Sequence, residues 1–197
     1  MGHVGFVIPW VYHFLIRLRS LHYCSKNCRF KTVNDTCMKY LELMKEIPAK
    51  AKLDIDMNLI AFRAPDQIYY SDSCPAGLGG YSDQGHAWRF HVPSHLQFRV
   101  TNNLLKYLAA NITPWINSLA GHLEFGDCAL SMTDSTTAEG WMRKSNFNEV
   151  GDDSIQATVR ADPACHHARL FMDAEIKGFS QWFAGKLNNF ADALPRD

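Results

Sequence analysis

Three aspartates lie where short strands are expected to end, and no other feature of this sequence constrains its fold as strongly. They are Asp72, Asp134 and Asp192, and they stand in three distant parts of the chain. Carboxylates brought together from distant segments can hold two divalent cations, and such a pair can cleave a phosphodiester by in-line displacement. The pattern therefore favours a fold that gathers these three side chains into one acidic site.

The alternation of apolar and polar residues predicts a mixed α/β sheet. Three strands come first and form an antiparallel meander, after which strands and helices alternate. The expected strands are 67–73, 77–82, 86–92, 128–133 and 179–183, and the expected helices are 96–119, 135–144, 164–176 and a last one from 187 onwards. Pro114 is expected to kink or split the first of these helices. Residues 146–153 are expected to form a polar loop.

The chain divides into a basic N-terminal extension and an acidic module that carries the aspartates. Residues 1–66 hold ten Lys and Arg against six Asp and Glu, whereas residues 67–197 hold ten against fourteen. Over the whole chain the charges balance at 20 each, so the sequence shows no overall preference for polyanions. We expect residues 1–63 to form a helical extension and residues 64–197 to form the folded domain.

Two helices are expected in the extension, at Val4–Leu18 and around Asn34–Ile47. The first is too short to cross the roughly 30 Å of a bilayer. It also lacks the basic start and the small-residue cleavage site of a signal peptide. We therefore expect an intracellular protein, cytoplasmic or nuclear, that is not secreted and has no membrane partner.

Six cysteines, at positions 24, 28, 37, 74, 128 and 165, follow no regular framework. Cys24, Cys28 and Cys37 lie near His22 and stay open as zinc ligands, but scattered reduced thiols are the interpretation that we favour. Ser73 and Ser135 have no recognisable histidine partner, so nucleophilic hydrolase chemistry is not supported. No small-molecule cofactor is expected, because the glycines near residue 80 do not form a dinucleotide fingerprint.

Three segments, taken in order, resemble the ribonuclease H domain of retroelement (retrotransposon) reverse transcriptases. Ser71–Tyr81 resembles the first catalytic strand, Met132–Ala138 is similar to the strand-to-helix junction, and Gln181–Arg196 resembles the closing element. The set covers most of residues 64–197, and residues 1–30 are similar to the segment that joins the polymerase to ribonuclease H. The resemblance implies a ribonuclease H-like mixed five-stranded sheet flanked by helices. It also suggests an isolated C-terminal fragment of a larger reverse transcriptase.

The resemblance implies an endonuclease that cleaves RNA in RNA–DNA hybrids with two Mg²⁺ or Mn²⁺ ions held by four acidic residues. Asp72, Asp134 and Asp192 match three of these catalytic metal ligands. The fourth position, a glutamate in the family, is Lys106 in the stretch Asn102–Ala110.

Lys106 is expected to weaken metal binding, because it puts a positive charge where the resemblance implies a negative ligand. At about 4 Å and an effective dielectric constant of about 20, each pair of unit charges interacts by about 4 kcal/mol. Two interpretations that would preserve activity stay open: Lys106 points away from the carboxylates, or a single metal ion suffices.

The remaining candidates concern nucleic-acid contacts. Arg89, Arg99, Arg143 and Lys144 are candidates for binding backbone phosphates, with a solvated surface as the equal alternative. The alternative function is a catalytically inactive retroelement remnant that binds nucleic acid, or that docks on a polymerase subunit through the apolar helix Val4–Leu18.

The glycines of the hairpin after Asp72 also leave two interpretations open. Gly77, Gly79 and Gly80 would allow a nucleic-acid strand to approach the backbone closely, or they are ordinary hairpin glycines.

Overall fold

The computed structural model describes residues 63–97, 99–144 and 154–196, together with part of the stretch 38–49. The described residues within 38–49 are helical, which agrees with the helix expected around Asn34–Ile47. The predicted helix Val4–Leu18, the zinc alternative and the loop 146–153 lie outside the described residues. None of the described helices is long and apolar enough to cross a membrane.

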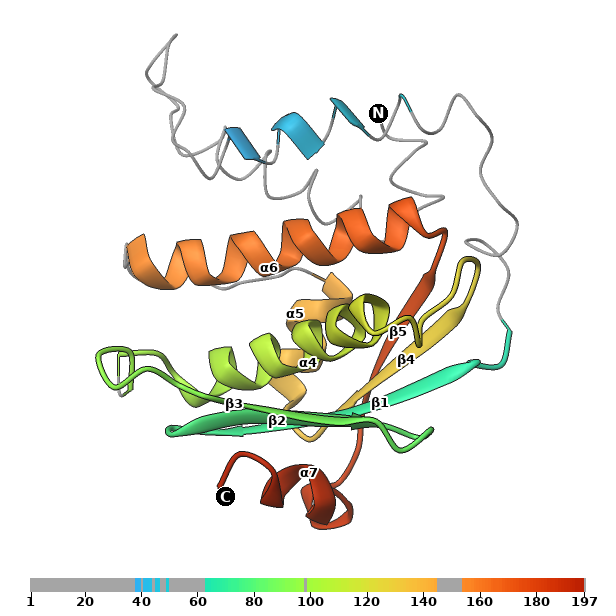
Figure 1. Ribbon diagram of the computed structural model, residues 1–197. Coiled ribbons are helices and arrows are strands. Elements are labelled where there is room, and N and C mark those ends of the chain that lie inside the picture. The colour runs from blue at the N-terminus through green and yellow to red at the C-terminus, as the bar shows by residue number, and fades with distance from the viewer. Residues whose placement is uncertain are drawn as a thin grey trace, which may run out of the picture.

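A mixed five-stranded sheet with the order β3-β2-β1-β4-β5 forms the centre of the domain (Figure 1). The first three strands pair antiparallel as a meander, and β4 and β5 add in parallel on the other side of β1. The strands are β1 (Gln67–Cys74), β2 (Gly77–Ser82), β3 (Ala87–His91), β4 (Cys128–Thr133) and β5 (Lys177–Trp182). This architecture confirms the predicted mixed five-stranded sheet flanked by helices.

The helices cover the two faces of the sheet unequally (Figure 1). Three long helices lie on one face: α4 (Asn102–Leu119), α5 (Thr136–Lys144) and α6 (Ser154–Asp173). Within the described ranges, the opposite face carries the short helix α7 (Asn189–Ala193), which follows the 3-10 turn Gly185–Leu187. The core between the sheet and the long helices contains Tyr69, Leu78, Leu104, Leu105, Ala129, Phe171 and Ile176.

Two helix starts differ from the prediction. Helix α4 begins at Asn102 rather than near Leu96, because Thr101 is extended and its hydroxyl accepts a hydrogen bond from the Leu104 amide. Helix α6 begins at Ser154, ten residues earlier than expected, and Pro163 lies inside it.

Pro114 does not split α4, which continues through it to Leu119. The Thr113 hydroxyl donates to the carbonyl of Ala109 at 2.8 Å, and Asn117 donates its amide to the carbonyl of Thr113 at 2.9 Å. Proline has no N–H to donate to the Ala110 carbonyl, so α4 continues through Pro114 with one backbone hydrogen bond fewer. The two side-chain bonds give the Thr113 hydroxyl and the Asn117 amide nitrogen partners within the helix.

The described part of the extension packs on α6. Arg169 makes two hydrogen bonds to the Glu46 carboxylate, at 3.1 and 3.0 Å, and Lys39 pairs with Asp162. Leu43 is completely buried. The described residues between 38 and 49 therefore pack against the sheet domain through α6.

Candidate acidic site

The site lies where β4 ends beside the central strand β1. The parallel ladder between these strands stops at the pair Tyr70 and Met132, and β1 continues beyond it to Cys74. The freed edge of β1 carries Asp72, and the turn after β4 carries Asp134. Sites in α/β sheets commonly form in such a gap between strand ends.

Asp72 is held rigidly in a nearly closed environment. It is 3% exposed, it pairs with Gly79 of β2, and its Oδ1 accepts a hydrogen bond from the Ser73 amide at 2.8 Å. Because Asp72 lies within a strand, its backbone is fixed, and its carboxylate is well placed to act as a ligand or an ion-pair partner.

Asp134 follows β4 directly, but it does not cap the next helix. The Ser135 hydroxyl accepts the bond from the Ala138 amide at 3.1 Å, so Ser135 is the capping residue of α5. The Asp134 carbonyl accepts a hydrogen bond from the Trp182 indole at 2.9 Å. A Cβ atom built on Gly185 would stand 3.0 Å from Asp134 Oδ2, so this backbone packs tightly against the carboxylate.

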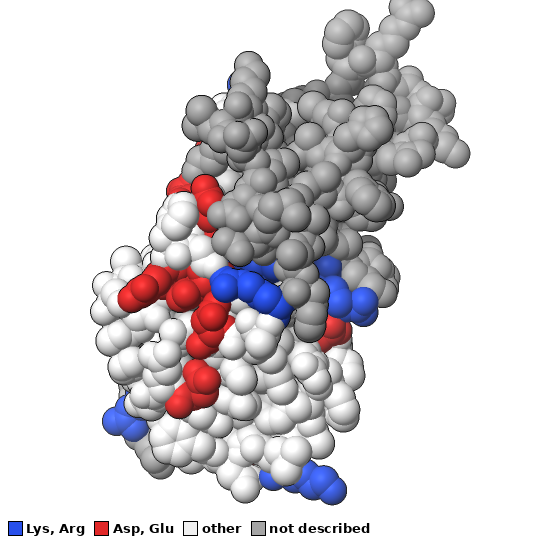
Figure 2. All heavy atoms as spheres, turned by 90° about the vertical axis from the view of Figure 1, so that its right-hand side faces the viewer, with Lys and Arg blue, Asp and Glu red and all other residues white. Residues whose placement is uncertain are grey.

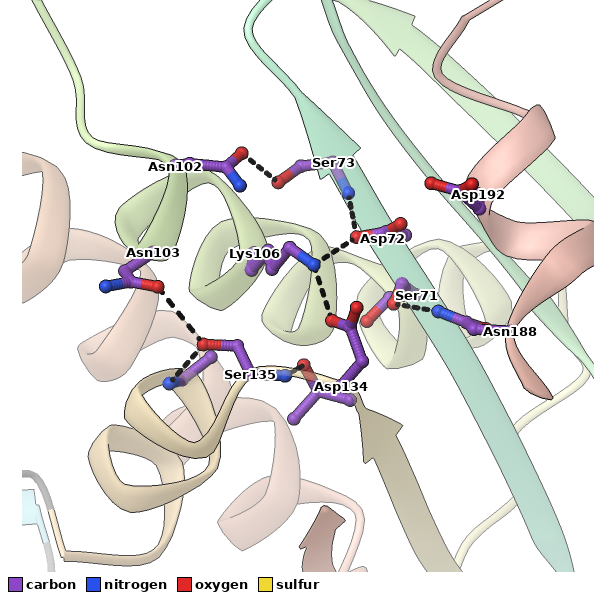
Figure 3. A network of polar contacts seen from close by, with 12 residues as sticks. Ser71, Asp72, Ser73, Asn102, Asn103, Lys106, Asp134, Ser135, Asn188 and Asp192 are labelled. Carbon is purple, nitrogen blue, oxygen red and sulfur yellow. Dashed lines mark hydrogen bonds and ion pairs between the residues drawn. The ribbon is translucent and has the colours of Figure 1, made fainter. Parts of the chain in front are cut away.

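Lys106 lies between the two carboxylates (Figure 3). Its Nζ is 2.9 Å from Asp72 Oδ1 and 2.6 Å from Asp134 Oδ1, and its side chain is 15% exposed. The interpretation in which Lys106 points away from the aspartates is therefore wrong. Position 106 is on the inward face of α4, where a long side chain reaches the gap at the end of β4.

Burial and ion pairing act in opposite directions on the pKa of Lys106 and on that of Asp72. Burial lowers the pKa of Lys106, but the hydrogen bonds and charges of Asp134 and Asp72 outweigh burial and raise it. Burial raises the pKa of Asp72, and the contact with Lys106 offsets this only in part. At neutral pH the ammonium is therefore fully charged and carries the positive charge of the site.

Asp192 lies apart from this cluster. It is in α7, its side chain is 42% exposed, and its Oδ1 accepts a hydrogen bond from Arg196 at 2.6 Å. Figure 3 shows it on the side of β1 away from Lys106. Asn188, which is buried, donates to the Ser71 carbonyl at 3.2 Å and ties the start of α7 to β1. The structure thus places all three predicted aspartates around one end of β1, and it pairs two of them through Lys106.

The predicted metal ions do not fit the site as it stands. Across the described residues, no group of three or more His, Cys, Asp or Glu side chains is arranged to hold a metal ion. The ammonium already binds the oxygens of Asp72 and Asp134 that would face a cation between them. A divalent ion at about 2.1 Å from both carboxylates would have to displace it.

The C-terminal segment of the chain packs against the hairpin glycines. A Cβ on Gly77 would stand 2.4 Å from the Pro195 carbonyl oxygen, and one on Gly79 would stand 2.6 Å from the Cβ of Leu194. Gly80 packs against Thr113 on the opposite face. These three positions therefore require glycine because other parts of the same protein approach the hairpin backbone closely, and not because a nucleic-acid strand does.

The four predicted phosphate-binding residues come from three separate segments of the described chain. Arg89 and Arg99 are exposed, Arg143 bonds Glu139 at 2.8 Å, and Lys144 ends α5. Of the four, Arg89 alone is in register with the site. It pairs with Gly79 of β2, and Gly79 pairs with Asp72 of β1. Two strand spacings therefore separate the backbones of Arg89 and Asp72, a distance of roughly 10 Å.

The charged side chains do not form one basic surface on the face seen in Figure 2. Asp and Glu side chains lie there beside Lys and Arg side chains. This mixed pattern agrees with the balanced charge of the whole sequence.

Sequence reasoning missed two contacts of the site. The pairing of Asp192 with Arg196 follows the i,i+4 spacing of a helix and was available from the sequence. The hydrogen bond from the Trp182 indole to the Asp134 carbonyl joins positions 48 residues apart, so no local sequence pattern predicts it.

The solved structures that are similar to this chain include two ribonuclease H domains. Ribonuclease H1 from the halophilic archaeon Halobacterium salinarum is 16% identical, with a TM-score of 0.46, and the match covers 66% of this chain and 94% of that one. An N-terminal ribonuclease H domain from Mycobacterium tuberculosis, solved as a fusion with maltose-binding protein, is 15% identical with a TM-score of 0.46, covering 68% and 93%. No protein-family model and no curated protein matches the chain.

Proposed function

We propose that this chain is a ribonuclease H-like domain that binds RNA–DNA hybrids and whose cleavage of the RNA strand is suppressed by Lys106. The observation that carries the proposal is the ammonium of Lys106 seated between Asp72 and Asp134. Three of the four acidic residues that a two-metal nuclease would need are present, and the cation between Asp72 and Asp134 is the ammonium group of Lys106.

The proposed suppression follows from charge. A glutamate at position 106 would give Asp72, Asp134 and itself a combined charge of −3, whereas lysine leaves −1. Two divalent cations bring a charge of +4, so the glutamate cluster balances most of it and the lysine cluster very little. Displacing the ammonium also means moving a charged group out of two short hydrogen bonds, which costs several kcal/mol.

Hybrid binding is proposed from the resemblance of three segments and from the placement of Arg89. That side chain is exposed and stands in the same row of the sheet as Asp72. The paired carboxylates also repel phosphates less than free ones would, because Lys106 and Arg196 neutralise part of their charge. Binding of this kind is expected to weaken as salt concentration rises.

Cleavage of an end-labelled RNA–DNA hybrid, with Mg²⁺ or Mn²⁺, tests the proposal. The unaltered chain is expected to bind the hybrid and cut it slowly or not at all. Lys106→Glu is expected to raise the cleavage rate by at least about tenfold, which corresponds to about 1.4 kcal/mol of activation free energy.

The matched control is the double variant Lys106→Glu with Asp134→Asn, which restores the glutamate but removes a neighbouring ligand. It should cut no faster than the unaltered chain. Rapid cleavage by the unaltered chain would overturn the suppression, and absence of hybrid binding by a folded sample would overturn the substrate.

A further inference from the structure

We infer that Lys106 is the resident cation of the acidic site, so that the site is complete without metal and becomes a divalent-cation site only when the ammonium is removed. The inference deepens the proposed function, on which it rests for the choice of site. It predicts cation binding and stability, whereas the proposed function predicts hybrid binding and cleavage.

The first step is geometric. Three separate elements supply the cluster: Asp72 comes from β1, Lys106 from α4 and Asp134 from the turn after β4. Both carboxylates approach the same nitrogen within 2.9 Å. A single positive charge therefore joins the elements that a bridging metal ion would otherwise join.

The second step concerns the surroundings of the ammonium. The side chains of Asp72, Lys106 and Asp134 are 4%, 15% and 18% exposed, so water screens their interaction poorly. The backbone at Gly185 closes against Asp134, and the Ser73 amide holds Asp72. The carboxylates are thus fixed in position by the fold, and they would stay there if the ammonium were removed.

The third step is the exchange of one cation for another. Lys106→Met keeps a long apolar stem but removes the charge, which leaves two fixed, nearly buried carboxylates facing an empty position. Such a pair is destabilising by mutual repulsion, and a hard divalent cation with oxygen ligands relieves it. Loss of the ammonium and gain of metal affinity are therefore expected together.

Thermal unfolding and Mn²⁺ binding of the full chain test the inference. For the unaltered chain we expect no change of Tm on adding Mn²⁺ or EDTA. Lys106→Met is expected to lower Tm by roughly 5–15 °C. Mn²⁺ should recover at least half of that loss and bind with one-to-one stoichiometry by calorimetry, because ligands that bind only the native state stabilise it.

The control is Lys106→Met combined with Asp134→Asn, which should unfold early and gain nothing from Mn²⁺. If Lys106→Met loses stability without gaining Mn²⁺ affinity, or if the unaltered chain binds Mn²⁺ between Asp72 and Asp134, the inference is wrong. Cation binding by Lys106→Met without any hybrid binding would leave the inference standing and overturn the proposed function instead.

A second measurement does not depend on the folding of Lys106→Met. Mass spectrometry after mild amine acylation of the unaltered chain should find Lys106 protected and the exposed Lys186 modified. Asp134→Asn removes one of the two carboxylates and should raise the acylation of Lys106 several-fold. Equal modification of Lys106 and Lys186 in the unaltered chain would contradict a seated ammonium.

Discussion

At the scale of single residues, the structure shows how strongly the meaning of a position depends on its neighbours. Asp72 and Lys106 are each ordinary residues in their own segments, and their chemistry appears only because β1 and α4 bring them within 2.9 Å of each other. His166 and His167 illustrate the same point. His166 is exposed and stacks on Trp115, whereas the Nδ1 of its neighbour His167 is buried without a hydrogen-bond partner.

His167 is expected to make the domain sensitive to acid. Burial lowers its pKa to about 4, and a hydrogen bond to the Asn111 backbone opposes this only in part. The unfolded chain binds a proton near pH 6.5 and the native state does not, so stability is present above pH 6.5 and is lost as the pH falls toward 4. Each pH unit in this window costs up to about 1.4 kcal/mol.

Urea unfolding of the His167→Gln variant between pH 4.5 and 7 checks this expectation. Its stability should fall less steeply with decreasing pH than that of the unaltered chain. His166→Gln serves as the control and should keep the original slope. Identical slopes for all three proteins would show that His167 is accessible to protons in the native state.

At the scale of elements, α7 and the residues after it depend on glycines in the facing hairpin. Leu194 and Pro195 lie against Gly79 and Gly77, and the Cys74 thiol donates to the Pro195 carbonyl at 3.2 Å. This contact positions α7, and α7 positions Asp192. The glycine-rich hairpin is therefore linked to the acidic site through packing.

Gly79→Ala is expected to cost about 1–3 kcal/mol of unfolding free energy, because its Cβ would stand 2.6 Å from Leu194 Cβ. Hydrogen exchange of the Asp192 amide, which bonds the Asn188 carbonyl, should speed up in this variant. Gly140→Ala is the matched control: its Cβ meets no atom within 4 Å and the residue is in α5, so it should stabilise by about 0.4–1 kcal/mol. Unchanged exchange at Asp192 in Gly79→Ala would disprove the coupling.

At the scale of the whole molecule, the described part of the N-terminal extension is tied to the sheet domain through α6. Glu46 and Arg169 form a two-bond ion pair, and Leu43 has no exposed surface. The boundary at residue 63 remains a proposal about folding units, and the contacts on α6 suggest that residues before it contribute to stability.

Leu43→Ala is expected to lower the unfolding free energy of the whole chain by about 2–4 kcal/mol, since it opens a cavity at a buried position. Leu41 lies two residues before Leu43 and is 37% exposed, so Leu41→Ala should lower the unfolding free energy much less. Circular dichroism of the sheet domain during urea unfolding measures both. A Leu43→Ala protein whose sheet unfolds at the original urea concentration would indicate two independent units.

The sequence by itself predicted five strands, the antiparallel meander of the first three and the positions of the three aspartates along the chain. Strands β2 and β4 have the predicted bounds, because glycines, turns and alternating apolar residues are local signals. Local signals did not predict the first residues of α4 and α6, because prolines and capping residues compete there with the helical periodicity of the apolar residues.

Only the tertiary structure decided how Lys106 acts. The sequence showed a lysine at a position that resembles a glutamate, but its direction depends on the packing of α4 against the end of β4. The same holds for the hairpin glycines, whose partners Leu194 and Pro195 lie more than 110 residues away. Residue types follow from the sequence, whereas the distance between two charges follows from the fold, and that distance makes Lys106 the cation of this site.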